Sequence, residues 1–368
     1  MKTRLFVFLL CCFVACSHLQ VKAVAVSVNE NVELMSVLSR LSGYQEYCMD
    51  VAGAYINDLD SCFGKYSEHP AIAYMKELRD ECGIAYDAVM SMAVRLCNDD
   101  GRFSLLEEDS DGLDARWGGA DKEKFLSLLS SFYAYSGFRS FFEAHDSFYR
   151  VGLHAYEDSV LKHFDEKWYE SFYGKEPEET FNVIIGFVNG YANYGPSRQL
   201  KGMKKEVFAI VGYAVDESGT PRYNRNYLST LVHEFNHSFV NYLLDAEIYS
   251  DHADALEDAG GFLLESSLWS MRSQAYNFWK TVINESLVRA AVICYMLDNG
   301  YPKEEVETEM LSQIGRNFRW MPELVALLKS YRAQQAEYGT FENFYPRVIS
   351  FFNGYADRER LRLNAVFD

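Results

Sequence analysis

The sequence predicts an α+β fold that is predominantly α-helical, with a small sheet preceding one particular helix. Apolar residues at spacings of three and four predict helices in both halves of the chain. Two apolar, β-rich runs, residues 181–188 and 207–215, interrupt this pattern, and each ends in turn residues. A helix with an apolar stripe follows at residues 228–240. The expected order is therefore strand, strand, helix within a mostly helical chain.

That helix contains the most specific motif of the chain, His233-Glu234-Phe235-Asn236-His237. Residues i and i+4 lie on one helix face, so both imidazoles of an H-E-x-x-H motif can reach one metal ion. Zinc held by neutral imidazoles lowers the pKa of a bound water to roughly 7, and the intervening glutamate can take its proton. The motif predicts Zn²⁺ ligands at His233 and His237 and a general base at Glu234. The alternative is two histidines that merely make hydrogen bonds inside a helix pair.

A catalytic zinc site needs a third protein ligand, and Glu285 is the preferred candidate. It lies in an apolar helical run, residues 279–293, where a buried carboxylate needs a compensating partner. An ion pair with Arg289, four residues later, is the competing explanation, and both interactions can hold at once. Glu257 is the second candidate ligand, but the Ala-Gly-Gly sequence that follows it weakens any helix there.

Asn284-Glu285 resembles the second motif of the gluzincins, the thermolysin-like zinc peptidases. The metzincin extension with a third histidine is absent, because Val240 and Leu243 occupy its positions. Gluzincins carry an acidic residue four positions after the glutamate, which orients the first histidine, whereas this chain has Arg289 there. An orienting carboxylate must therefore come from elsewhere, with Asp254, Asp258 and Glu265 as open possibilities, or be absent.

Together with residues 29–44 and 284–290, the H-E-x-x-H motif resembles an uncharacterised family of secreted bacterial zincin-like proteins, a domain of unknown function. The resemblance spans most of the mature chain. It implies a zincin-like metallopeptidase fold and export, and it implies zinc ligands at His233, His237 and Glu285. It implies no substrate.

The strands upstream of the motif helix are expected to hold substrate. Zincins use the edge strand of a sheet to bind extended peptide through backbone hydrogen bonds. The loop at residues 191–198 can bring Asn193 or Tyr194 to the substrate oxyanion, and we take Tyr194 as the candidate catalytic residue. As turn chemistry alone the same loop is unremarkable.

The N-terminal segment predicts export. Two basic residues precede an apolar run, residues 5–14, which is too short for a membrane helix and suits a signal peptide. The sequence Phe-Val-Ala-Cys16 resembles a bacterial lipobox, whereas the pattern around Ala23 permits ordinary signal cleavage. We expect a signal peptide over residues 1–23, or lipoprotein cleavage before Cys16. The protein would reside in the cell envelope or be secreted.

The mature chain divides into an N-terminal helical lobe, residues 24–176, and a zincin-like catalytic lobe, residues 177–368. We expect helices at residues 31–43, 70–97, 121–149, 153–173, 303–314 and 321–338, and an acidic loop at 98–119. Five cysteines remain after the signal segment, so at least one is unpaired and disulfide connectivity stays open.

The net charge of the chain limits the classes of molecule that it can bind. The net charge of −18 argues against nucleic acid and against electrostatic attachment to anionic lipid, which leaves a possible N-terminal lipid as the membrane contact. The sequence predicts a zinc metallopeptidase that cleaves a peptide or protein substrate through a zinc-activated water. The alternative is a non-catalytic envelope binding or structural lipoprotein with a zincin-like fold. A glycosidase has no carboxylate spacing to recommend it. Oligomeric state and cleavage specificity are not predicted.

Overall fold

The computed structural model describes residues 24–366, apart from residues 50–52, 107–108, 110–111, 213 and 275. The predicted signal peptide, with Cys16, lies outside the described residues. The fold is α+β and mostly helical, which confirms the predicted class. In the described part of the chain, no helix has both the length and the apolar character needed to cross a membrane.

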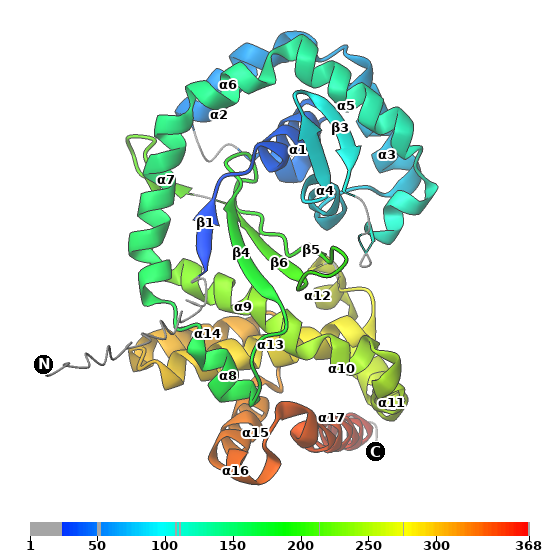
Figure 1. The fold of residues 1–368 in the computed structure, drawn as a ribbon. Coiled ribbons are helices and arrows are strands. Elements are labelled where there is room, and N and C mark those ends of the chain that lie inside the picture. Colours follow the sequence, from blue (N-terminus) through cyan, green and yellow to red (C-terminus); the bar gives the residue numbers. More distant parts are fainter. Residues whose placement is uncertain are drawn as a thin grey trace, which may run out of the picture.

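A four-stranded sheet lies near the centre of the molecule (Figure 1). Strands β1 (Ala25–Ser27), β4 (Thr180–Ile185) and β6 (Glu206–Val211) run parallel, and β5 (Ser197–Arg198) pairs antiparallel with β6 at the edge. The apolar runs predicted as strands form β4 and β6, and most of their side chains are buried. Both precede the motif helix, as the sequence predicted. A separate hairpin pairs β7 (Ala214–Val215) with β8 (Pro221–Arg222).

Much of the segment between β1 and β4 forms an arch of helices over the sheet (Figure 1). The helices and hairpin strands of this segment are α1 (Glu30–Leu41), α2 (Gly53–Phe63), α3 (Pro70–Cys82), α4 (Asp87–Ala93), β2 (Leu96–Asp99), β3 (Arg102–Leu105), α5 (Lys122–Ser136), α6 (Phe138–Ala144), α7 (Asp146–Ser159) and α8 (Lys167–Tyr173). Helix α8 is not part of the arch and lies below the sheet in Figure 1.

Three predictions in this segment were too coarse. The helix expected over residues 153–173 is divided into the end of α7, a short 3-10 turn and α8. The helix expected over residues 121–149 is broken, because Gly137 adopts a left-handed φ of 68° that ends α5. The helix expected over residues 70–97 ends in the same way at Gly83, and the acidic loop after it begins as the β2–β3 hairpin. All five described cysteines are free thiols.

The segment after β8 is helical and lies below the sheet in Figure 1. It contains α9 (Asn226–Val240), α10 (Tyr242–Asp245), α11 (Ser250–Ser266), α12 (Leu268–Ser273), α13 (Trp279–Asp298), α14 (Lys303–Gly315), α15 (Met321–Ala333), α16 (Gln335–Tyr338) and α17 (Phe341–Asn364). Helix α13 is buried from Val282 to Met296 and packs against α9, α11, α14 and α15. It is the central helix of this half.

The expectation that glycines weaken a helix after Glu257 was wrong, because α11 continues through Gly260 and Gly261. A Cβ atom on Gly260 would lie 2.4 Å from Trp279 Cε3. Close packing of α11 against Trp279 therefore requires glycine here and offsets its poor helix propensity.

Candidate metal centre

Helix α9 holds the H-E-x-x-H motif against the sheet. Its apolar stripe is buried, and the ring of Phe235 stacks on Phe181 of β4 with centroids 4.2 Å apart. Packing that stripe inward leaves His233, Glu234 and His237 on the helix face that is only partly buried. Because α9 also packs against α13, the motif can meet side chains from that helix.

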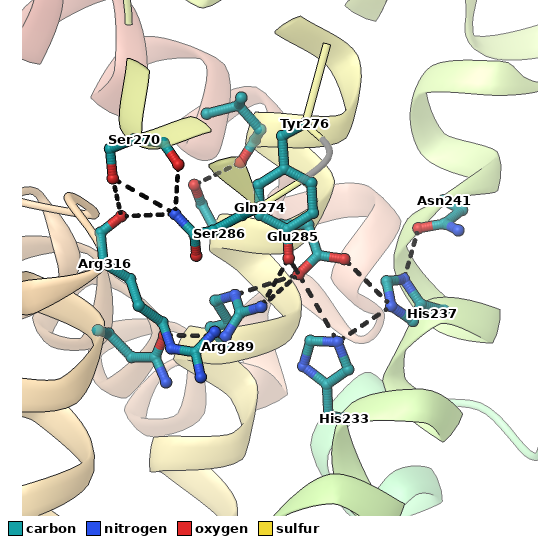
Figure 2. A network of polar contacts seen from close by, with 12 residues as sticks. His233, His237, Asn241, Ser270, Gln274, Tyr276, Glu285, Ser286, Arg289 and Arg316 are labelled. Carbon is teal, nitrogen blue, oxygen red and sulfur yellow. Dashed lines mark hydrogen bonds and ion pairs between the residues drawn. The ribbon is translucent and has the colours of Figure 1, made fainter. Parts of the chain in front are cut away.

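Glu285 of α13 faces both histidines (Figure 2). Its Oε2 lies 3.6 Å from His233 Nε2, and its Oε1 lies 3.5 Å from His237 Nε2. The two Nε2 atoms are 3.3 Å apart. One ligand atom from each residue lies within 4.8 Å of the others, so this group can hold a metal ion. The structure thus brings together the three residues that the sequence proposed as ligands.

Glu285 is buried, yet its surroundings favour the carboxylate. The hydroxyl of Tyr276 donates to its Oε2 at 2.9 Å, and Arg289 Nε donates to the same oxygen at 3.1 Å. Burial raises the pKa of Glu285, but the facing histidines, Arg289 and the Tyr276 hydrogen bond outweigh it and lower the pKa to about 2.

The ion pair with Arg289 therefore coexists with the ligand geometry. It is a buried pair rather than the helix-surface pair that the spacing suggested, with 11% of the Arg289 side chain exposed. Arg289 also donates to Gln313 Oε1 at 3.0 Å. Glu257, the competing ligand, is exposed on α11 and lies outside the group.

Both histidines have features that suit metal ligation. Burial lowers the pKa of His233 to about 3, which keeps its imidazole in the neutral form that a metal requires. His237 Nδ1 lies 3.1 Å from Asn241 Oδ1. An amide oxygen can only accept, so Nδ1 carries the proton and the lone pair of Nε2 faces the site.

Asn241 is the orienting residue that sequence reasoning missed. The carboxylates considered for that role lie on α11 and are exposed. One of them, Asp258, pairs instead with Arg360 at 2.8 Å. The signal was present in the sequence, because Asn241 follows His237 by one helical turn and must share its face.

Replacing Asn241 with alanine is expected to weaken zinc binding by about 10–100-fold, the usual cost of losing a residue that orients a ligand. Affinity would be measured by competition with a chromophoric chelator. Asn343→Ala, an exposed asparagine on α17, serves as the matched control. An Asn241→Ala protein with wild-type affinity would remove the orienting role.

Glu234 lies beneath the chain segment that leads into β5, the edge strand of the sheet. Burial raises the pKa of Glu234 to about 7. A Cβ atom built on Gly195 would lie 2.7 Å from Glu234 Oε2, so the chain just before β5 passes directly over this carboxylate. Asp87 of α4 adds a second carboxyl group to the same region, and nothing in the sequence singled it out.

Two cavities of about 690 Å³ each meet at the centre and share Asp87, Glu234, His237 and Glu285 as lining residues. We call the first the Tyr242 arm, which is also lined by Lys175, Glu179, Ser197, Lys205, Tyr242 and Glu342. We call the second the Tyr194 arm, which is also lined by Asn193, Tyr194, His233, Tyr276, Gln313 and Arg316. The centre therefore lies in the middle of a cleft.

Tyr194, the candidate catalytic tyrosine, lines the arm that bears its name. Its side chain is 3% exposed and its ring stacks on Tyr47 with centroids 6.0 Å apart. Burial raises the pKa of Tyr194 well above its usual value, so the hydroxyl stays protonated and can donate a hydrogen bond.

Fold and site together define a mostly helical α+β protein with a two-histidine, one-glutamate centre in a cleft beside a sheet edge. Residues 24–351 match the model of the family described as "Domain of unknown function (DUF4932)", and the chain belongs to that family. Comparison with curated proteins and with solved structures gave no match.

Proposed function

We propose that this protein is an exported zinc metallopeptidase with a zincin-like catalytic site. The observation that carries the proposal is the convergence of His233, His237 and Glu285 around one point, with the carboxylate of Glu234 beside it in the same cleft. Export rests on the N-terminal sequence alone.

The donor set fits zinc. Two imidazole nitrogens and one carboxylate oxygen are a ligand combination of catalytic zinc sites, and no thiol or thioether that would favour copper is among them. When bound, zinc would polarise a peptide carbonyl and lower the pKa of the attacking water. The hydrogen bonds that Tyr276 and Asn241 make to the ligands fix their orientation.

Glu234 is the residue that moves protons. A buried carboxyl with a raised pKa is poised to accept a proton from water and return it to the departing amine near neutral pH. Glycine at position 195 supports this role, because any side chain there would displace Glu234. A non-catalytic binding protein would have no need of a base in this place.

The edge of the sheet supports a peptide substrate. The N–H and C=O of Tyr194 both bond to Ile210, and Phe208 N donates to Pro196 O at 3.0 Å. Strand alternation therefore turns the peptide groups of Gly195 away from β6, toward the cleft. The carbonyl of Ser197, the next outward residue, already accepts from Arg95 Nη2 at 2.6 Å. Gly195 is therefore the position where an extended peptide can pair with this edge through backbone hydrogen bonds. Tyr194 is the proposed donor to the substrate oxyanion.

A digest of mixed peptides tests the proposal. The wild type should cleave in the presence of trace zinc, stop when a chelator removes the metal, and recover when zinc is added back. Products identified by mass spectrometry would give the cleaved bonds. The proposed function would be overturned if cleavage continued in the presence of the chelator, or if the zinc-loaded protein cleaved no peptide.

A further inference from the structure

Arg316, at the end of α14, presents an unpaired cation to the Tyr194 arm. Its side chain is exposed and lines that cavity. Among the described residues, none makes a hydrogen bond or ion pair with its guanidinium. In Figure 2 its side chain extends toward Arg289, and the dashed lines to Arg316 end at its carbonyl oxygen.

The backbone of Arg316 is held in position. Its carbonyl oxygen accepts from Ser270 Oγ at 3.2 Å and from Gln274 Nε2 at 3.0 Å, and its N–H donates to Ser312 O at 3.0 Å. The arm therefore has a cation on a fixed support, which reduces the entropy that a ligand must remove on binding.

Among the described residues, no carboxylate that lines this arm forms an ion pair with Arg316. Glu309 lines the same arm, but its Oε1 accepts from Gln313 Nε2 at 2.5 Å, and Gln313 in turn accepts from Arg289. Arg289 forms an ion pair with Glu285. Arg316 is thus the guanidinium of this arm that remains available for an anionic group of a ligand.

The sheet edge sets the direction of a bound peptide. The chain runs from Tyr194, in the Tyr194 arm, through Gly195 to Ser197, in the Tyr242 arm. A peptide paired antiparallel with Gly195, whose N–H and C=O are turned away from β6, runs the opposite way, and antiparallel pairing is the more stable arrangement. Its N-terminal part would occupy the Tyr242 arm, and its C-terminal part would enter the Tyr194 arm.

We propose that Arg316 binds the C-terminal carboxylate of the substrate, so that the enzyme removes short fragments from peptide C-termini. This inference rests on the proposed peptidase function, since it needs a peptide in the cleft. Two separate features support it: the direction that pairing with Gly195 imposes, and an unpaired guanidinium in the Tyr194 arm, where the C-terminal part of the peptide would lie. A guanidinium can donate hydrogen bonds to both oxygens of one carboxylate at once.

The test compares three short N-acetylated peptides. One has a free C-terminal carboxylate, the second is its C-terminal amide, and the third is the amide with an internal glutamate. Binding to the zinc-loaded Glu234→Gln protein, which should bind without turnover, would be measured by fluorescence anisotropy. The same measurement on proteins that also carry Arg316→Gln or Arg319→Gln gives the matched comparison. Arg319 is exposed on the same connection and bonds to Asn317.

We expect the free acid to bind about tenfold more tightly than the amide, the usual scale for a charge-assisted hydrogen bond. Arg316→Gln should erase that preference and Arg319→Gln should keep it. Equal binding of acid and amide, or a preference that survives Arg316→Gln, would overturn the proposal. Tighter binding of the internal glutamate peptide alone would replace it with recognition of an acidic side chain.

The two hypotheses fail separately. An acid preference that depends on Arg316, with no hydrolysis by the zinc-loaded wild type, would leave the carboxylate site standing and remove the peptidase function. Zinc-dependent hydrolysis without that preference would keep the peptidase and remove the role of Arg316.

Discussion

Glu234→Gln is expected to abolish peptide hydrolysis while leaving zinc bound. Glutamine keeps the shape of the side chain under Gly195 but cannot accept a proton, so the attacking water loses its base. Loss of a general base costs about 10²–10⁴ in rate. The measurement is kcat/KM on a peptide found in the digest, with zinc content determined on the same preparation.

The control is Glu265→Gln, an exposed glutamate on α11 outside both arms of the cleft, which should retain full activity. If Glu234→Gln turned over at the wild-type rate with zinc in place, the base would be another group. Asp87, which lines both arms, would then be the next residue to replace.

Glu285→Gln is expected to cost the protein most of its zinc affinity. The amide presents a weaker donor than a carboxylate, and it leaves Arg289 as a buried cation without an anionic partner. We expect affinity to fall by at least the 100-fold that loss of a supporting residue can reach. Competition with a chelator measures it, and circular dichroism verifies that the variant is folded.

Glu257→Gln is the matched control, because it changes the other carboxylate that sequence spacing made plausible as the third ligand. Glu257 is exposed on α11, so the zinc affinity of the Glu257→Gln protein should equal that of the wild type. His237→Ala tests the same centre from α9 without disturbing the Arg289 pair. Weaker zinc binding in Glu257→Gln, with unchanged binding in Glu285→Gln, would reverse the assignment.

Local sequence pattern predicted the parts of the fold that repeat regularly. The buried strands β4 and β6 and the stripe of α9 follow directly from apolar periodicity, because burial of one face or of both is what such patterns encode. Breaks set by a single glycine, such as Gly137, were missed. A glycine inside a periodic run can be tolerated or can end a helix, and the apolar pattern alone does not distinguish the two outcomes.

The candidate centre was predictable to the extent that it lies on one helix face. His233, Glu234 and His237 are fixed by helical spacing, and Glu285 was reached through its burial and its resemblance to a gluzincin motif. Residues that come from distant segments were not predictable, because only tertiary packing brings them together. Tyr276, Asp87 and Arg316 belong to this class, and their positions emerged only from the fold.

The zinc content of the purified protein tests the central claim most directly. Wild type and His237→Ala would be stripped of metal, dialysed against trace zinc and measured by elemental mass spectrometry. The proposed centre predicts about one zinc per wild-type chain, the content of a single catalytic site, and none in His237→Ala. A wild-type chain without zinc, or a His237→Ala chain that keeps it, would contradict the assignment of His233, His237 and Glu285 as a zinc site.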